Sequence, residues 1–305
     1  MSFVWVILVA LIVLVLPNWL ESRRQMPDLS KVTGQMAELE MGRTHYRWMG
    51  PVRGPVIVAI HGLSTNSVVW NAMAKGLVGL GYRVLVYDLY GRGFSDAVKG
   101  RQNADFFVMQ LEELLEDQGL YQDLTLLGYS MGGAIATAFA ARNPDRMKRL
   151  VLLAASGVDV NEDPQHRFMR RWPVLGDWLH ALREPLQMRS RLSAHEDKMR
   201  SVPDLFEGQE RDLARKGYFP SLLSSRRGIL AERQMVAHRG LGVDGIPVLA
   251  IWAEKDEVIP ISSVGTLAQW NRTARQEVIE GAGHGMPYTH PDEVVESLRE
   301  LLQRD

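Results

Sequence analysis

Short apolar runs alternate with longer stretches of helical pattern, and this alternation constrains the fold more than any other feature of the chain. Runs that are apolar without interruption are typical of strands buried on both faces of a parallel sheet. Strand-like and helical segments in alternation predict βαβ units, and hence an α/β fold with a mostly parallel sheet flanked by helices. The apolar runs are 56–60, 84–87, 124–127, 150–154 and 248–252, and the helical patterns are 68–80, 102–118, 130–142 and 291–302.

The alternation is interrupted once, over residues 158–242, by a stretch of helical pattern without strand-like runs. Residues 160–240 carry fifteen Lys or Arg against eleven Asp or Glu, together with several aromatic and Met residues. Such a stretch predicts a helical lid, inserted over the carboxyl edge of the sheet. The α/β core is then expected in two pieces, 36–157 and 243–305, and the first piece begins with a hairpin whose turn is at Gly42.

The first twenty residues are apolar enough to be a membrane segment. Every residue from Phe3 to Leu16 is apolar, and a helix over Phe3–Leu20 would be near the lower limit of length for crossing a bilayer. A cleavable signal peptide is the main alternative, with a buried or interfacial helix as a third. No Lys or Arg precedes the run and no small-x-small cleavage site follows it, so we favour an uncleaved anchor over the signal peptide.

The charges that flank the apolar run predict an orientation. Arg23, Arg24 and Lys31 follow the run, and positive charges tend to stay on the cytoplasmic side. We therefore predict a single-pass protein with a transmembrane anchor over 1–20, a polar linker over 21–35 and a cytoplasmic catalytic domain.

The remaining composition excludes several kinds of chemistry. The chain has 305 residues, a formal net charge of −1 and no cysteine. The net charge gives no reason to expect a nucleic-acid partner. The lack of cysteine excludes disulfides, thiolate metal sites and a cysteine nucleophile.

The sequence Gly128-Tyr129-Ser130-Met131-Gly132 contains the pattern G-x-S-x-G between an apolar run and an Ala-rich helical pattern. That setting is typical of a nucleophile elbow, a tight turn that exposes a serine at the carboxyl edge of the sheet. Glycine has no Cβ atom, and at these two positions a Cβ would collide with neighbouring backbone in such a turn. The alternative is a serine that caps a helix after a glycine turn. We expect Ser130 to be a nucleophile and the N–H of Met131 to face a developing oxyanion.

A second loop with the sequence His61-Gly62-Leu63-Ser64 also follows an apolar run. A backbone N–H from such a loop is the natural second oxyanion donor, and Leu63 is our candidate. His61 is expected to hold the loop through its ring rather than to take part in the chemistry.

An acid and a base are expected at two further strand ends. Asp256 follows the run 248–252, where Glu254 and Glu257 are its rivals. His284 follows a short strand and has glycine on both sides, which gives a loop that can carry the imidazole over the serine. The other histidines lie in less suitable places: His45, His166, His180, His195, His238 and His290.

The chain order of Ser130, Asp256 and His284 is the order found in α/β-hydrolases and differs from that of other serine hydrolase folds. His284 is expected to take the proton of Ser130, and Asp256 to fix the tautomer of the imidazole and stabilise its charged form. The product of attack on a carbonyl is an acyl-enzyme, which water hydrolyses. This chemistry needs no metal or organic cofactor, and we expect none.

With these motifs the chain resembles α/β-hydrolase-fold esterases of the lysophospholipase or monoacylglycerol lipase type, over roughly Gly42–Leu302. The resemblance lies in the motifs G-Y-S-M-G and H-G-L-S, and in Asp88–Ser95, which is similar to the D-x-x-G-x-G-x-S loop of the superfamily. That loop is expected to be a shape-keeping turn. The resemblance implies an acid after the strand near Trp252, which matches Asp256.

Other members of the same fold define the alternatives. Epoxide hydrolases and haloalkane dehalogenases have an aspartate nucleophile, so Ser130 argues against them. Hydrolases of carbon–carbon bonds share the serine triad, but many have a Trp directly after the histidine, where this chain has Gly285. A haloperoxidase-like hydrolase is a further alternative that the sequence does not exclude.

The anchor and the net-basic, apolar lid together predict a lipid-derived ester as substrate, such as a monoacylglycerol or a lysophospholipid. Trp172 and Trp178, with Phe and Met residues of the lid, are expected to line an acyl tunnel. A small soluble ester, a thioester or a C–C bond is the alternative substrate, and acyl transfer to an acceptor other than water is an alternative reaction. A non-catalytic, membrane-tethered binding module is the alternative from another class.

Overall fold

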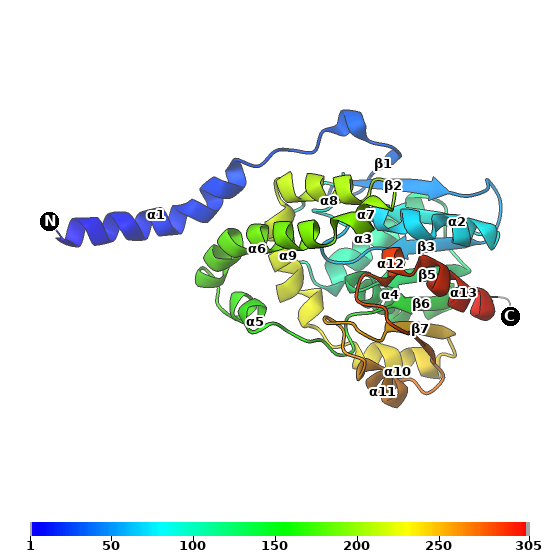
Figure 1. Ribbon diagram of the computed structural model, residues 1–305. Coiled ribbons are helices and arrows are strands. Elements are labelled where there is room, and N and C mark those ends of the chain that lie inside the picture. The colour runs from blue at the N-terminus through cyan, green and yellow to red at the C-terminus, as the bar shows by residue number, and fades with distance from the viewer. Residues whose placement is uncertain (1, 303–305) are drawn as a thin grey trace.

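One sheet organises the chain in the computed structural model, which describes residues 2–302 (Figure 1). Its strand order is β1-β2-β4-β3-β5-β6-β7-β8. β1 and β2 form the expected antiparallel hairpin and β2 pairs antiparallel with β4, whereas all other neighbours are parallel. The predicted mostly parallel sheet is confirmed. The strands are β1 (Gln35–Glu38), β2 (Arg43–Met49), β3 (Val56–Ile60), β4 (Arg83–Tyr87), β5 (Leu124–Tyr129), β6 (Met147–Leu153), β7 (Val248–Ala253) and β8 (Arg275–Ile279).

Helices cover both faces of the sheet, which explains why its strands are apolar without interruption. In β3, Val58 and Ile60 pack into the core that includes α3, α4, α10 and α11, whereas Ile57 and Ala59 pack into the core that includes α2 and α13. Each residue of these strands therefore meets apolar neighbours. These helices are α2 (Asn71–Gly79), α3 (Ala104–Asp117), α4 (Met131–Arg142), α10 (Met235–Val243), α11 (Ser263–Trp270) and α13 (Pro291–Leu302), with α12 (Met286–Thr289) just before the last.

The stretch between β6 and β7 is helical, as the sequence pattern predicts. Five of its helices form a group that we call the helical insertion: α5 (Pro164–Arg171), α6 (Leu175–Ala194), α7 (Glu196–Arg200), α8 (Leu205–Ala214) and α9 (Tyr218–Arg227). The sixth helix, α10, packs on α4 and α11 and so lies in the layer against the sheet. The domain boundaries and the action of the insertion as a lid stay predictions.

One aromatic residue of the insertion lies elsewhere than expected. The Trp172 side chain, between α5 and α6, is 53% exposed. It therefore lies on the surface and lines no internal tunnel. The expectation was wrong because the apolar character of a residue in a helical pattern does not say whether it faces the body or the solvent.

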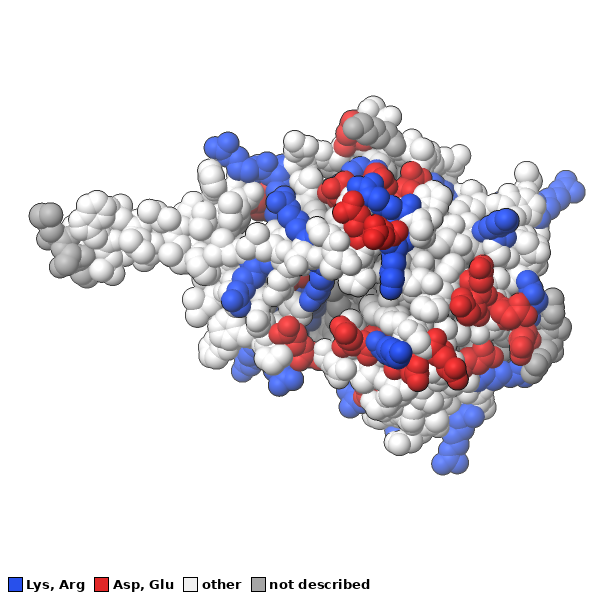
Figure 2. Space-filling view, in the orientation of Figure 1, with Lys and Arg blue, Asp and Glu red and all other residues white. Residues whose placement is uncertain are grey.

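The N-terminal helix α1 (Ser2–Ser22) projects from the body, away from the end that carries α13 (Figure 1). Its part beyond the body carries no charged side chain, whereas Lys and Arg side chains surround its base on the face that Figure 2 shows. Within residues 2–302, Val4–Ser22 is the one helical segment long and apolar enough to cross a membrane, with a mean hydropathy of 2.2. A signal sequence has the same properties, so the anchor stays a prediction.

Candidate active site

Ser130 occupies a strained turn between β5 and α4. Its φ is 52°, a left-handed conformation that non-glycine residues adopt at a cost of about 1–3 kcal/mol. The start of α4 lies so close to the end of β3 that position 132 requires glycine. A Cβ on Gly132 would lie 2.1 Å from the carbonyl oxygen of Ile60. The turn is held from the other side, where the N–H of Ser130 donates to the carbonyl of Leu153 over 2.9 Å. The local geometry is therefore that of the predicted elbow.

A chain of hydrogen bonds joins the three predicted residues. Nε2 of His284 lies 3.0 Å from Oγ of Ser130, and Nδ1 of His284 lies 2.8 Å from Oδ2 of Asp256. They follow β5, β7 and β8, whose carboxyl ends share one edge of the sheet. Ser130 and Asp256 are buried, whereas the His284 side chain is 23% exposed. This arrangement can remove the serine proton and hold the resulting imidazolium against a carboxylate.

Of the three acids in this loop, Asp256 is the one that contacts the ring of His284. Oδ1 of Asp256 accepts hydrogen bonds from the N–H groups of Val258 and Ile259, each over 2.8 Å. These bonds leave Oδ2 to face His284. Glu257 is exposed, and Glu254 is exposed and accepts from the N–H of Gly281. Glu254 thus supports the loop that carries the histidine and does not contact the ring.

The two predicted oxyanion donors belong to two segments that adjoin Ser130, the start of α4 and the loop after β3. Met131 is the first residue of α4, so its N–H has no partner within the helix. The loop of Leu63 approaches the serine closely, because a Cβ on Gly62 would lie 3.3 Å from the Cβ of Ser130. Nε of Arg92 donates to the carbonyl of Leu63 over 3.1 Å and so holds this loop.

Arg92 is a buried support that the sequence reasoning missed. Burial lowers the pKa of its guanidinium to about 10, which still leaves it charged at neutral pH. Besides Leu63 it contacts the Gln102 side chain and Ser225 of α9. The one available signal was its place in the Asp88–Ser95 motif. This arginine connects the loop beside Ser130 to the helical insertion.

His61 holds its loop, as expected, and does not contact Ser130. Nδ1 donates to the carbonyl of Gly62 over 2.8 Å, and Nε2 accepts from the N–H of Leu89 over 2.9 Å. Burial lowers the pKa of the ring to about 4. The ring is therefore neutral near pH 7, with one nitrogen donating and the other accepting.

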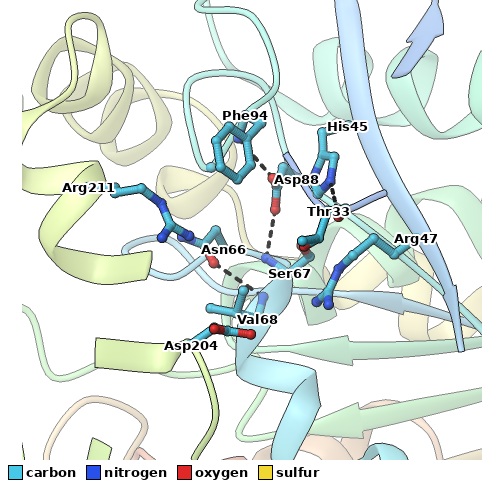
Figure 3. A pocket seen from close by; sticks show the side chains of 11 residues that line it. Thr33, His45, Arg47, Asn66, Ser67, Val68, Asp88, Phe94, Asp204 and Arg211 are labelled. Carbon is cyan, nitrogen blue, oxygen red and sulfur yellow. Dashed lines mark hydrogen bonds and ion pairs between the residues drawn. The ribbon is translucent and has the colours of Figure 1, made fainter. Parts of the chain in front are cut away.

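Asp88 is the centre of the predicted shape-keeping turn (Figure 3). Its carboxylate accepts from the N–H groups of Ser67 and Phe94 and lies 2.7 Å from Nδ1 of His45. Burial by itself raises the pKa of Asp88, but the charge and hydrogen bond of His45 outweigh it and hold the pKa well below its usual range. Gly93, with a φ of 52°, has no room for a Cβ beside this carboxylate. A cavity of about 80 Å³ adjoins this turn.

A second support that sequence reasoning missed is Tyr129. Its hydroxyl donates to the backbone carbonyl of His284 over 2.9 Å. No sequence signal pointed to it, because it occupies a variable position of the G-x-S-x-G pattern. Of the histidines that the structure describes, only His284 has a hydrogen bond to Ser130. Within residues 2–302 no group of three or more His, Asp or Glu side chains is placed to hold a metal ion.

This fold and this site define the class of protein. The chain matches the α/β hydrolase fold family over residues 55–291. That match covers more than half of the chain, which therefore belongs to this family. The predicted α/β-hydrolase fold is thereby confirmed, whereas the match does not distinguish the lysophospholipase or monoacylglycerol lipase type from other members.

Its similarity to particular proteins is more distant. The chain is 27% identical over 268 residues to the pimeloyl-[acyl-carrier protein] methyl ester esterase of Aliivibrio salmonicida, an alignment that covers 85% of this chain and 97% of that protein. It is 25% identical over 282 residues to epoxide hydrolase 3 of Xenopus tropicalis, an alignment that covers 86% of this chain and 75% of that protein.

Solved structures show the same fold at lower identity. A thermophilic esterase from Thermogutta terrifontis matches with a TM-score of 0.72 and 22% identity, covering 89% of this chain and 99% of that one. A bromoperoxidase from Bacillus anthracis matches with a TM-score of 0.73 and 21% identity, covering 90% of this chain and 100% of that one. At such identities these structures support the architecture and not a shared reaction.

Proposed function

We propose that this protein is a serine hydrolase of carboxylic esters, with Ser130 as nucleophile, His284 as general base and Asp256 as the acid that orients the base. The observation that carries the proposal is the unbroken hydrogen-bond chain from Ser130 Oγ through His284 to Asp256. Its setting at a strained elbow supports it, because strain of this kind persists where the surrounding structure enforces it.

The proposed reaction follows from these contacts. Oγ of Ser130 attacks the carbonyl carbon of the ester, and its proton passes to Nε2 of His284. The N–H groups of Leu63 and Met131 stabilise the oxyanion, and losing one such donor typically costs about 3–4 kcal/mol. The leaving alcohol takes the proton from His284 as the acyl-enzyme forms. A water molecule then gives a proton to His284 and attacks the acyl-enzyme. His284 returns the proton to Ser130 as the carboxylic acid leaves. The chain is proposed to need no cofactor.

The relatives support ester chemistry more than the alternatives of the fold. One relative is named a methyl ester esterase, and a serine at the elbow suits acyl transfer. Another is named an epoxide hydrolase, but the aspartate nucleophile expected of that class is replaced here by Ser130. A small soluble ester is a second candidate substrate that these names favour.

A lipid-derived ester, such as a monoacylglycerol or lysophospholipid, is our proposed substrate. Its support is the exposed apolar helix α1, which we propose as a single-pass membrane anchor with the hydrolase domain on the cytoplasmic side. The helical insertion is proposed as the lid through which an acyl chain reaches Ser130. Apolar side chains in such a site favour long chains, because each buried CH₂ contributes about 0.8 kcal/mol.

A fluorophosphonate probe tests the proposed nucleophile. We expect covalent labelling of the full-length protein and none of Ser130→Ala. Ser156→Ala is a matched control, because Ser156 is buried nearby and its N–H donates to the carbonyl of Ser130; it should label normally. If wild type is not labelled, the non-catalytic binding module is the better explanation. If Ser130→Ala is labelled, the nucleophile lies elsewhere.

A series of p-nitrophenyl esters, assayed in neutral detergent, tests the substrate class. We expect kcat/KM to rise with acyl length beyond eight carbons. Activity on short soluble esters, with none on longer chains, would overturn the lipid proposal while leaving the serine mechanism intact.

A further inference from the structure

A cavity of about 490 Å³ lies where the base of α1 meets α6 and α9 of the helical insertion. Its volume lies within the range of known small-molecule sites in proteins. None of Ser130, His284, Asp256, Leu63 or Met131 lines it, so it is a separate site. Its walls include Glu21, Arg101, Asp177, Ala181, Phe219 and Arg227.

The wall contributed by α1 is fixed in place. Glu21 accepts a hydrogen bond from the N–H of Gly217, and the backbone of Gln25 pairs with the segment that joins α8 to α9. The guanidinium of Arg24 lies 4.3 Å from the ring centroid of Phe219. The cavity is thus built by contacts that tie the base of α1 to the insertion.

The cavity combines an apolar wall with an excess of positive charge. Leu20, Phe219 and Leu223 come from two facing helices and supply apolar surface. Three guanidinium groups and two carboxylates line the same space, which leaves a formal charge of +1. An apolar wall beside positive charge suits a ligand that has an apolar chain and an anionic head.

Arg101 is the cation that is available to a ligand. Arg24 is paired with Glu21 over 3.2 Å, and Arg227 with Asp177 over 2.5 Å. Arg101 is exposed and makes no ion pair with any residue in the described range 2–302.

The loop of Arg101 is nonetheless held at the rim. Oγ of Ser224 donates to the carbonyl of Gly100 over 2.9 Å and accepts from the N–H of Gln102 over 3.1 Å. A free guanidinium on a fixed backbone suits recognition of an anion.

We propose that this cavity binds a single-chain anionic amphiphile, with its carboxylate or phosphate head at Arg101 and its chain against Leu20, Phe219 and Leu223. The cavity adjoins the end of the segment Val4–Ser22. If that segment crosses a bilayer, the cavity opens at the membrane surface, where such amphiphiles are found. The site is distinct from Ser130 and does not depend on the reaction proposed there.

Binding is tested with the full-length Ser130→Ala protein in dodecyl maltoside micelles, so that no probe is consumed. Energy transfer from tryptophan to cis-parinaric acid reports occupancy, and oleate, oleoyl lysophosphatidate and oleyl alcohol compete for the site. We expect at least one anion to compete tenfold better than the neutral alcohol. The ratio of the two anions then shows which head group the site prefers.

Two substitutions locate the site. Arg101→Glu, at an exposed side chain, should weaken competition by the preferred anion at least tenfold and leave the alcohol unchanged. Ala181→Trp, which fills the cavity, should abolish binding of all three. Arg53→Glu and Ser190→Trp are matched controls, because both residues are exposed outside the cavity and the second lies on the same helix as Ala181. The proposal is overturned if the alcohol competes as well as the anions, or if Ala181→Trp and Arg101→Glu bind like their controls.

Discussion

The hydroxyl of Tyr129 donates a hydrogen bond to the backbone carbonyl of His284, so the residue before the elbow serine also fixes the loop of the histidine. The two rings are 5.4 Å apart between centroids. Burial raises the pKa of Tyr129 well above its usual value, so the hydroxyl keeps its proton and stays a donor at assay pH. This hydrogen bond therefore joins the end of β5 to the loop after β8 without using the side chains of Ser130 and His284.

Tyr129→Phe should lower activity without abolishing it. It removes one neutral hydrogen bond, which is typically worth about 0.5–1.5 kcal/mol, and this corresponds to a fall in kcat/KM of about 2- to 10-fold. Tyr87→Phe is the matched control, because the buried hydroxyl of Tyr87 has no hydrogen-bond partner among the described residues. Steady-state kinetics on one ester should show a loss for the first variant only. Equal effects would mean that the hydroxyl does not position His284.

Asp256→Asn should lower kcat by about 10⁴-fold, because an amide at this position favours the wrong tautomer of the histidine. Glu254→Gln should stay within a few-fold of wild type, since glutamine can still accept from the N–H of Gly281. The measurement is kcat for both variants at saturating ester. A loss at Glu254 as large as that at Asp256 would contradict the assignment of the acid.

Ser130→Ala and His284→Ala should each lower kcat by at least about 10⁴-fold, and the double variant should be little worse than either one. Once either residue is lost the proton transfer between them is lost as well, so removing the second residue adds little further loss of kcat. His290→Ala is the control, because its ring contacts Thr289 and not Ser130. Losses that multiply in the double variant would show that the two residues act independently.

The sequence predicted those parts of the site that depend on local pattern. Ser130 lies between a recognisable strand and helix, and Asp256 and His284 follow recognisable strands, so the parallel sheet brings them to one edge. Asp256 was the acid chosen from the sequence over Glu254 and Glu257, and the structure adds the contact with His284 that the sequence could not show.

Contacts between distant segments could not be predicted in the same way. The bond from Tyr129 to His284 spans 155 positions. Arg92 looks like one more charged loop residue, yet it is buried and donates to the carbonyl of Leu63. Trp172 fits an apolar helix pattern, yet its side chain faces outward. Each depends on how elements pack, which periodicity does not encode.

His238 should make the protein sensitive to acid. The ring is buried and neither nitrogen has a hydrogen-bond partner among the described residues. Burial lowers its pKa to about 4, below the value of about 6.5 for an unfolded histidine. Between these values the unfolded state binds more protons, so stability falls as pH drops through 6.5 and the loss is complete below about 4.

His238→Leu should therefore reduce this acid sensitivity. In the full-length protein in neutral detergent, the fall in Tm from pH 7 to pH 5 should be smaller than in wild type. Its Tm at pH 7 should be equal or higher, because an unsatisfied buried polar group is removed. His195→Leu, at an exposed ring, should leave the pH dependence unchanged. If His238→Leu keeps the wild-type pH dependence, the ring does not titrate as inferred.

The apolar helix should retain the protein in membranes through its middle residues. We expect the full-length chain to stay with the membrane pellet after alkaline carbonate, and its intact mass to include residue 2. Val9→Arg with Ile12→Arg should release it, because each arginine at a bilayer centre costs about 2.5–3.5 kcal/mol. Val9→Leu with Ile12→Leu keeps the apolar surface and should stay in the pellet. A mass that lacks the first twenty or so residues would instead identify a cleaved signal peptide, and the cytoplasmic orientation would then be wrong as well.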